Sequence, residues 1–295
     1  MSKTIKVHLA LFAVSLLYGA TYAMAKAVMP MYIKPFGFIV LRVSSALLLF
    51  LVFHALFVRQ RVDKKDLIPL AISAFFGSAA NMLLFFAGLE ITTPIHASVL
   101  MLVTPVFVLL ISLLTGAEKP SVQKIGGVML SAMGALFLMG GIRLSFSADT
   151  LLGDVFIILN AISFAIYLVY VKKLMVKYNP FTVSRWNFIF GFIYVLPFGF
   201  SQLSDIEWAS FTGEIWFYVV FICVGTTFLT YLLNAYALQH TGSSLVGTYI
   251  YLQPVVAGVI AVSKGMESLT GMKVFFILLI FAGVYLVSKK HKTKV

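Results

Sequence analysis

Residues 98–138 read SVLMLVTPVFVLLISLLTGAEKPSVQKIGGVMLSAMGALFL and contain two apolar runs that are separated by a short polar connector. Residues 244–286 read SLVGTYIYLQPVVAGVIAVSKGMESLTGMKVFFILLIFAGVYL and have the same layout. Each stretch carries a proline inside its first run, a glutamate in its connector and a glycine in its second run. The two stretches therefore indicate that one structural unit occurs twice in the chain.

The evidence for this duplication comes from residue types that rarely coincide by chance. One constant shift along the chain aligns Pro105 with Pro254, Glu118 with Glu267, Lys124 with Lys273 and Gly134 with Gly283. Matches between leucines or valines are weaker support, because all apolar helices share those residues, and chance similarity of that kind is the alternative. The shift predicts two halves, residues 1–145 and 146–295, each with five apolar runs.

The composition excludes a soluble globular domain. Apolar residues make up 61% of the 295 residues and charged residues 11%, whereas soluble domains average about 45–50% and about 25%. Disordered chains are poor in apolar residues, so disorder is excluded too. The net charge of +12 would suggest a nucleic-acid partner in a soluble protein, but the basic residues here form short clusters between apolar runs. The single cysteine, Cys223, excludes an intrachain disulfide.

The apolar runs have the length of transmembrane helices. A helix needs about 20 apolar residues to cross a bilayer, and lipid offers no partners for unpaired backbone groups. Ten such runs follow one another, at 8–29, 36–57, 67–89, 95–115, 123–140, 153–172, 181–200, 213–238, 244–263 and 270–288. They predict an all-α polytopic membrane protein with ten transmembrane helices and no separate soluble domain.

The basic residues predict the orientation in the membrane. Most of the 22 Lys and Arg residues fall on one side if the N-terminus is cytoplasmic, as the positive-inside rule requires. Ten spans then put both termini in the cytoplasm and the protein in the cytoplasmic (inner) membrane. Because each half has an odd number of spans, the second half must be inverted relative to the first. Inverted repeats are typical of secondary transporters, whose solute site lies between the halves.

The two quoted stretches resemble EamA-type members of the drug/metabolite transporter superfamily. The resemblance covers nearly the whole chain and depends on the mid-helix proline, the glutamate at the helix end and the glycine in the following helix. It implies a small-solute carrier that works by alternating access between two pseudo-symmetric bundles. One departure from the family pattern is Lys264, which puts a basic turn on the outer side. The resemblance does not reveal the solute.

Polar side chains inside the spans are candidates for a solute site, because such groups are costly in lipid unless they pair or face water. Several of them recur at helical spacing, which puts them on shared helix faces. The candidate substrate-binding residues are Tyr18, Tyr22, Arg42, Asn81, Asn160, Tyr167, Thr230, Asn234, Tyr251 and Gln253. Packing between helices is the alternative for any one of them, whereas the set favours a cavity with apolar walls and a few polar groups.

Charged residues discriminate between transport mechanisms. Arg42, about two turns into its span, could meet a carboxylate or could serve a structural role. No Asp or Glu lies at mid-depth in a predicted span, which favours facilitated diffusion or exchange over proton antiport, although Glu90 could still couple. Glu90 and His96 flank the short turn between the third and fourth spans, where they either gate the transporter or cap helices. We expect Glu118, at a connector, to pair with Lys119.

Two prolines and a row of small residues predict local helix geometry. Proline lacks an N–H group, so Pro105 and Pro254 predict kinks at matching depth, which are either hinges for alternating access or static features of packing. The carbonyls of Met101 and Ile250 should lose their usual partners and become free to bond a ligand. In the fifth span, small residues recur every four positions at Gly127, Ser131 and Ala135. We favour packing within the chain over a dimer seam.

The sequence lacks the signatures of the main rival classes. No catalytic or nucleotide-binding motif occurs, and the five histidines form no metal-ligand pattern. We therefore predict no catalytic residue, no metal and no cofactor. The predicted partners are a small-molecule substrate and membrane lipid, without nucleic acid, and a homodimer is compatible although a monomer suffices.

The predicted function is a membrane transporter for a small organic solute. The solute is an amino acid or a related amphipathic metabolite, and the transporter acts as an exporter or a facilitator by alternating access. A proton-coupled drug or metabolite antiporter is the alternative, and an intramembrane enzyme or a receptor is the alternative of another class.

Overall fold

The structure, a computed structural model, describes residues 2–140, 148–263 and 270–289, apart from the side chains of residues 22, 23, 94, 95, 148, 260, 261 and 263. Within those ranges the chain is almost entirely helical and contains no strand. The elements are α1 (Lys3–Val28), α2 (Pro35–Phe57), η1 (Lys64–Asp66), α3 (Leu67–Ala74), η2 (Phe75–Ala79), α4 (Ala80–Ile91), α5 (Pro94–Leu100), η3 (Met101–Val103), α6 (Thr104–Leu114), α7 (Val122–Leu138), α8 (Ala148–Lys177), α9 (Pro180–Ser204), η4 (Trp208–Ser210), α10 (Gly213–Val220), η5 (Phe221–Leu229), α11 (Thr230–His240), α12 (Ser243–Thr248), η6 (Tyr249–Leu252), α13 (Gln253–Ser263) and α14 (Gly271–Ser288). The η elements are short 3₁₀ or π turns that join or interrupt the longer helices.

Eight of the described helical segments are long and apolar enough to cross a bilayer. They are Lys3–Val28, Pro35–Phe57, Lys64–Ile91, His96–Leu114, Asp149–Lys177, Pro180–Ser204, Gly213–His240 and Gly271–Ser288. α7 is apolar but shorter, with 17 residues, and α12, η6 and α13 follow one another over residues 243–263. The all-α polytopic membrane fold is therefore confirmed, whereas the number of ten spans stays a prediction.

Large apolar side chains cover the outside of these helices. Leu48, Ile193 and Leu278 lie in the middle of α2, α9 and α14, and each is more than half exposed. Polar side chains such as Asn187 and Thr104 are fully buried in the same bundle. Apolar groups on the surface and polar groups inside are expected where lipid rather than water surrounds the helices.

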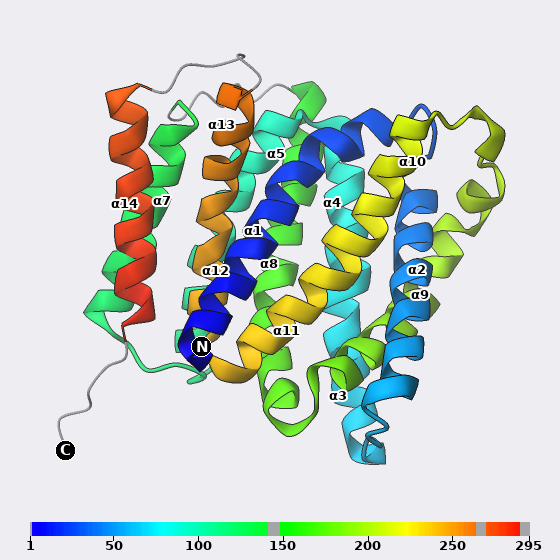
Figure 1. Ribbon diagram of the computed structural model, residues 1–295, viewed down its shortest axis with the longest axis horizontal. Coiled ribbons are helices and arrows are strands. Elements are labelled where there is room, and N and C mark those ends of the chain that lie inside the picture. Colours follow the sequence, from blue (N-terminus) through cyan, green and yellow to red (C-terminus); the bar gives the residue numbers. More distant parts are fainter. Residues whose placement is uncertain (1, 141–147, 264–269, 290–295) are drawn as a thin grey trace.

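The helices form one bundle around α8, with close helix pairs at its two edges (Figure 1). α7 and α14 lie side by side at one edge, and α2 and α9 lie together at the opposite edge. A Cβ atom on Gly127 of α7 would lie 2.7 Å from the carbonyl oxygen of Gly283 on α14. Ser131 Oγ donates a hydrogen bond to the carbonyl of Ile280 over 3.2 Å. The small residues of α7 therefore serve packing within the chain.

Both halves of the chain interrupt their helices in the same order. A π turn, η2, joins α3 to α4, and a longer π turn, η5, joins α10 to α11. A 3₁₀ turn, η3, precedes Pro105, and another, η6, precedes Pro254. π turns are rare in proteins overall, but those that occur are often found at functional sites. The prolines were visible in the sequence, whereas no feature of the sequence predicted the π turns.

Among the described residues, a buried carboxyl side chain lies at each end of the bundle. α1 and α12 begin and α6 ends at the end of the bundle that is lowest in Figure 1, and Glu118 follows α6 there. α4 ends and α5 and α8 begin at the opposite end, where Asp154 lies in the second turn of α8. Both residues are buried. We name these the Glu118 end and the Asp154 end.

Candidate functional site

A cavity of about 90 Å³ lies in the interior of the bundle. It is lined by Tyr18, Thr21, Arg42, Asn81, Met82, Phe85, Phe86, Met101, Asn160, Phe164, Tyr231, Ile250 and Gln253, which come from both halves of the chain. A water needs about 10–15 Å³ on this measure, so the space accepts several waters or a small organic solute. Five of the predicted site residues line it, namely Tyr18, Arg42, Asn81, Asn160 and Gln253.

Arg42 is the charged group of the cavity wall. It is 5% exposed, and its Nε donates a hydrogen bond to Thr227 Oγ1 over 3.0 Å. Its guanidinium carbon lies 4.7 Å from the centre of the Phe86 ring, a cation–π arrangement. Among the described residues, no carboxylate lies within ion-pair distance of Arg42. The positive charge of Arg42 therefore contacts only neutral groups in this part of the chain.

Asn160 contributes an unpaired hydrogen-bond acceptor. Its Nδ2 donates to the backbone carbonyl of Asn81 over 2.6 Å. Its Oδ1 is buried and has no hydrogen-bond partner among the described residues. A buried carbonyl oxygen without a donor is costly, so a donor from a water or a solute would complete this side of the cavity.

Tyrosine side chains connect the cavity wall to the interrupted helices. Tyr18 is hydrogen-bonded to the side chain of Thr230. Tyr231 donates its hydroxyl to the carbonyl of Gly77 in η2, and the ring centres of Tyr231 and Tyr167 lie 6.1 Å apart. A Cβ atom on Gly77 would collide with the Tyr167 ring. The π turn of the first half thus contacts two tyrosines of the second half, and glycine permits that contact.

A second cavity of about 40 Å³ adjoins the first. Met101, Ile250 and Gln253 line both cavities. The remaining lining of the second cavity is mostly apolar and includes Leu102 and Pro254. An apolar part of a solute fits this space while a polar part occupies the first cavity.

Four predicted site residues with described side chains lie outside the lining of both cavities. Tyr167 and Thr230 are buried behind the wall, where they contact lining tyrosines. Asn234 is buried on α11. Tyr251 is fully buried, and its hydroxyl has no hydrogen-bond partner among the described residues. The side chain of Tyr22 lies outside the described part of the chain.

The cavity wall also contains residues that the sequence did not single out as solute-binding. They are Thr21, Met82, Phe85, Phe86, Phe164 and Tyr231. Met101 and Ile250 also line the cavity, and the sequence singled them out only for their backbone carbonyls. Most are apolar or aromatic, and such residues occur on every face of these helices. Tyr231 did carry a signal, because it lies four positions after Thr227 and so on the same helix face.

The carbonyls ahead of the two prolines are bonded within the chain. The carbonyl of Met101 accepts a hydrogen bond from the N–H of Thr104, and that of Ile250 accepts one from the N–H of Gln253. The 3₁₀ turns supply these donors. The carbonyls are therefore less available to a solute than the sequence suggests, and the hinge role of both prolines stays a prediction.

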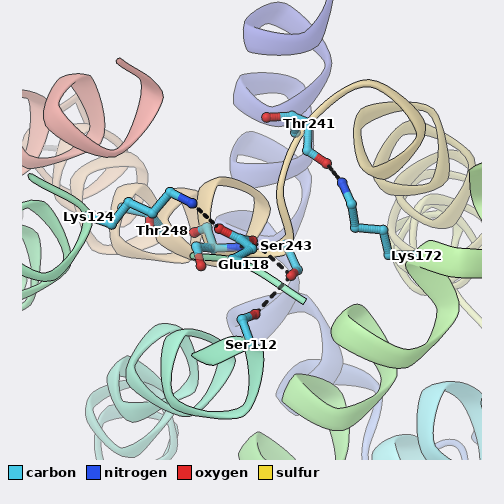
Figure 2. Close-up of polar contacts among 8 residues, drawn as sticks. Ser112, Glu118, Lys124, Lys172, Thr241, Ser243 and Thr248 are labelled. Carbon is cyan, nitrogen blue, oxygen red and sulfur yellow. Dashed lines mark hydrogen bonds and ion pairs between the residues drawn. The ribbon is translucent and has the colours of Figure 1, made fainter. Parts of the chain in front are cut away.

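At the Glu118 end, a buried carboxylate ties the two halves together (Figure 2). Glu118 Oε1 accepts hydrogen bonds from Ser243 Oγ over 3.1 Å and from the backbone N–H of Ser244 over 2.9 Å. Its Oε2 accepts one from Lys124 Nζ over 2.7 Å. Ser112 Oγ lies 3.0 Å from Ser243 Oγ and extends the network to α6. The start of α12 is therefore bonded to the connector between α6 and α7.

The connector backbone explains which lysine Glu118 contacts. Gly116 has φ +66°, a left-handed conformation that favours glycine. The N–H of Glu118 then donates to the carbonyl of Ser112 over 3.1 Å, which turns the chain back toward the bundle. The partner is Lys124, six positions further along, and not the adjacent and exposed Lys119 that we expected.

The hydrogen bonds of Glu118 favour its deprotonated form. Burial alone would raise the pKa of this carboxyl, but the bonds from Lys124, Ser244 and Ser243 outweigh burial and lower the pKa below its usual value. The side chain is therefore a carboxylate at neutral pH. Protonation would weaken these bonds.

Further polar contacts hold the same end together. Lys172 of α8 donates to the carbonyl of Thr241, in the turn before α12 (Figure 2). His8 Nδ1 of α1 lies 2.5 Å from the Tyr249 hydroxyl of η6. The segment from the turn at Thr241 through α12 to η6 is therefore contacted from three sides. The contacts come from α1, from the α6–α7 connector and from α8.

The Asp154 end has its own contact between the halves. Asp154 Oδ1 accepts a hydrogen bond from Thr92 Oγ1 over 2.6 Å and lies 3.7 Å from His96 Nδ1. A Cβ atom on Gly88 of α4 would lie 2.9 Å from the carbonyl oxygen of Gly153 on α8. The turn between α4 and α5 is therefore packed directly on the start of α8. In the described residues, no three His, Cys, Asp or Glu side chains gather to hold a metal ion.

These features define the class as a polytopic α-helical membrane protein with an interior solute-sized cavity. The profile of the EamA-like transporter family matches residues 5–140 and, a second time, residues 151–289. The chain belongs to the EamA-like transporter family, and it is therefore a membrane transporter.

Individual relatives agree with this family. An uncharacterized transporter of Archaeoglobus fulgidus is 28% identical over 75% of this chain and 76% of its own length. The uncharacterized transporter YyaM of Bacillus subtilis is 20% identical over 99% of this chain and 98% of its own. The uncharacterized inner membrane transporter YicL of Salmonella typhimurium is 24% identical over 59% of this chain and 58% of its own. A solved crystal structure with 16% identity superimposes with a TM-score of 0.76 over 95% of both chains and shares the fold.

Proposed function

We propose that this transporter carries a small solute with a carboxylate group, an amino acid or a related amphipathic metabolite, across the cytoplasmic membrane. The observation that carries the proposal is the buried guanidinium of Arg42 in the wall of the central cavity. Among the described residues this group has no carboxylate partner.

A buried cation favours an anionic ligand for a physical reason. Removing a guanidinium from water costs several kcal/mol unless other groups offset the loss. Thr227 supplies one hydrogen bond and Phe86 supplies one ring face, which is less than water would provide. A carboxylate matches the planar fork of arginine and forms two parallel charge-assisted hydrogen bonds with it. A solute carboxylate would therefore complete this site.

The remaining cavity wall fits the rest of an amino acid. The unpaired Oδ1 of Asn160 accepts hydrogen bonds and suits an ammonium group. Met82, Phe85 and Phe164 provide apolar wall, and the adjoining second cavity extends it. Apolar walls with few polar groups are typical of sites for small organic ligands.

In this account the solute moves by alternating access between two inverted halves, residues 1–145 and 146–295. Support comes from the π and 3₁₀ turns that interrupt both halves in the same order and from the polar contacts at each end of the bundle. The contacts at the Glu118 end and those at the Asp154 end separate in turn. The positive-inside rule puts both termini in the cytoplasm, and the protein acts as an exporter or a facilitator.

Counterflow in proteoliposomes tests this proposal. Vesicles loaded with an unlabelled amino acid receive the same labelled amino acid outside, and parallel vesicles receive the matching amine that lacks the carboxylate. We expect labelled acid to enter and the amine to stay outside, with protein-free vesicles as the control. Equal counterflow of acid and amine, or no counterflow for a panel of amino acids, would contradict the proposal.

Proton-coupled antiport is the second candidate mechanism, and the contact between His96 and Asp154 favours it. A pH gradient across the same vesicles separates the two mechanisms. A facilitator lets the labelled solute equalise across the membrane, whereas an antiporter accumulates it against its own gradient.

A further inference from the structure

A pocket of about 240 Å³ lies at the Asp154 end, next to the edge of the bundle that α2 and α9 form (Figure 1). Its walls are the turn between α1 and α2 and the segment from the last turn of α9 to η4, which belong to different halves of the chain. Gln202 joins the two walls, because its Oε1 accepts hydrogen bonds from the N–H of Phe36 over 2.9 Å and from that of Gly37 over 3.1 Å. Among the described residues, this pocket shares none of its lining with the central cavity.

Side chains of both charges line this pocket. Lys34 lies on the α1–α2 wall, and Asp205 and Glu207 lie on the other wall. Lys34 Nζ lies 3.6 Å from Asp205 Oδ2, and both side chains are more than half exposed, so this ion pair contributes little by itself. The ammonium group and the carboxylates keep further hydrogen-bonding capacity for a ligand. We propose that the pocket binds the phosphoethanolamine headgroup of a membrane phospholipid.

The two charged groups of this headgroup match the two walls. The phosphate accepts hydrogen bonds from Lys34 Nζ, and lysine is a common phosphate ligand. The ammonium group donates hydrogen bonds to the carboxylates of Asp205 and Glu207. A water needs about 10–15 Å³ on the measure that gives this pocket about 240 Å³, so there is room for both groups. The bound headgroup links the α1–α2 turn to the segment after α9.

Aromatic side chains beside the pocket put it at the depth of lipid headgroups. Trp208 and Trp216 are exposed, and their ring centres lie 5.8 Å apart in a stacked arrangement. Phe211 contacts Trp216 and also Tyr32, which lines the pocket. Tryptophan and tyrosine are enriched where a membrane meets water. A lipid of the surrounding leaflet therefore reaches the pocket with its headgroup while its acyl chains stay in the bilayer.

The surface of α9 next to the pocket suits the acyl chains of the same lipid. Phe198 lies four positions before Gln202 and therefore on the same face of the helix. Its side chain is 60% exposed, whereas Gln202 lines the pocket. A lipid whose headgroup occupies the pocket can place an acyl chain along this face. The apolar contact favours a lipid over a soluble molecule with the same headgroup.

Native mass spectrometry of the delipidated protein in detergent measures this binding. The protein is titrated with three dioleoyl lipids that differ only in the headgroup, namely phosphatidylethanolamine, phosphatidylcholine and phosphatidylglycerol. The choline headgroup has no N–H donor for the carboxylates, and the glycerol headgroup has no cation. We expect phosphatidylethanolamine to bind at least about threefold more tightly than either, the effect of one partly exposed ion pair. Equal affinity for the three lipids would overturn the proposal.

Two substitutions at exposed positions separate the two ends of the headgroup. Glu207→Gln should lower the affinity for phosphatidylethanolamine about threefold without lowering the affinity for phosphatidylglycerol. Lys34→Gln should lower the affinity for both lipids, because both contain the phosphate. The matched controls are Asp149→Asn, an exposed acid at the same end of the bundle, and Lys119→Gln, an exposed lysine at the opposite end. Both controls should bind the three lipids as the wild-type protein does.

Soluble phosphoethanolamine tests whether the acyl chains matter. Added at the concentration of the lipid, it should leave the bound phosphatidylethanolamine in place, because it lacks the contact with α9. Displacement under these conditions would assign the pocket to a soluble ligand and overturn the assignment to a lipid. Wild-type lipid binding in both Lys34→Gln and Glu207→Gln would overturn the site itself. No transported solute is needed, so the result is independent of the proposed function.

Discussion

The carboxylate of Glu118 accepts a hydrogen bond from the backbone N–H of Ser244 over 2.9 Å, although the two residues are 126 positions apart. Glu118 lies in the connector after α6, and Ser244 lies in the first turn of α12. Because these segments belong to different halves, separating the halves at this end must break the bond. In the proposed alternating-access mechanism, this bond therefore marks the closed form of the Glu118 end.

Removing the charge of Glu118 should weaken this contact. Glu118→Gln replaces a buried carboxylate that accepts from Lys124, Ser243 and Ser244, and we expect a loss of about 2 kcal/mol in the free energy of unfolding. Denaturant titration of the purified protein in detergent measures it. Glu90→Gln, at an exposed position, is the matched control and should change stability by less than about 0.5 kcal/mol. Equal losses in both variants would contradict the role of Glu118.

The stability difference between the wild-type protein and Glu118→Gln should depend on pH in one direction. The pKa of Glu118 lies below its ordinary value of 4.5 in the folded protein, so its contribution is fully present above the ordinary value. It is lost as the pH falls through the folded-state pKa. Unfolding titrations at a series of pH values measure this difference. A difference that grows on acidification would rule out a stabilising carboxylate.

Gly242 leaves room for the Glu118 side chain. A Cβ atom there would lie 2.7 Å from Glu118 Oε1. The φ of −75° at Gly242 is one that alanine adopts without strain. Any loss of stability in Gly242→Ala therefore comes from displacing the Glu118 carboxylate. We expect a loss of about 1–3 kcal/mol in the free energy of unfolding. The loss should shrink when Glu118→Ala is already present, because the two residues are in contact.

A double-mutant cycle by denaturant unfolding measures that coupling. Gly213→Ala is the control, because a Cβ atom at Gly213 meets no atom within 4 Å, and it should leave stability nearly unchanged. If the changes in the free energy of unfolding for Gly242→Ala and Glu118→Ala simply add in the double variant, Gly242 does not act by making room for Glu118.

Asn81 and Asn160 should respond differently to alanine, although both line the cavity. The bond between them uses the side chain of Asn160 and the backbone of Asn81, so Asn81→Ala keeps it. We expect Asn81→Ala to raise KM with little change in stability, and Asn160→Ala to raise KM and to cost about 1 kcal/mol of stability as well. Saturation curves for transport and unfolding midpoints measure the two effects. Unchanged KM in both variants would assign the residues to packing.

The contact between α7 and α14 should be sensitive to one methyl group. A Cβ atom on Gly283 would lie 2.8 Å from the backbone nitrogen of Ser131, so Gly283→Ala forces the helices apart and should cost about 1–3 kcal/mol. Gly126→Ala is the control, because a Cβ atom on Gly126 meets nothing within 4 Å. Thermal unfolding of both variants in detergent is the measurement. Similar midpoints for the two would mean that this edge of the bundle adapts without strain.

Much of the fold could be predicted from the sequence, because the length and the apolar composition of a run are enough to indicate a transmembrane helix. The apolar runs at 36–57 and 213–238 correspond to α2 and to the segment from α10 to α11. The π turns could not be predicted, since helices that are apolar on every side carry no periodicity that would mark an inserted residue. The predicted runs at 36–57 and 181–200 begin one residue after Pro35 and Pro180, which are the first residues of α2 and α9, as expected for proline at the first helical position.

The candidate site was predictable only where a polar residue stood out against apolar neighbours. Arg42 and Asn160 did so, and both line the cavity. Phe86, which lies against Arg42, could not be distinguished from the many other aromatic residues of the chain. Asp154 was overlooked because it lies at the edge of its apolar run, where a charge ordinarily reaches water. Its burial depends on tertiary packing against α4, which local sequence does not encode.

Substitution of Arg42 tests the central claim most directly. The measurement is counterflow of a labelled amino acid in proteoliposomes that contain wild-type protein, Arg42→Gln or Arg42→Lys. Arg185→Gln is the control, because Arg185 also lies inside a helix but lines neither of the two interior cavities. We predict at least about a tenfold loss for Arg42→Gln, equivalent to about 1.4 kcal/mol, a smaller loss for Arg42→Lys and retained transport for Arg185→Gln. Undiminished counterflow in folded Arg42→Gln would contradict the account.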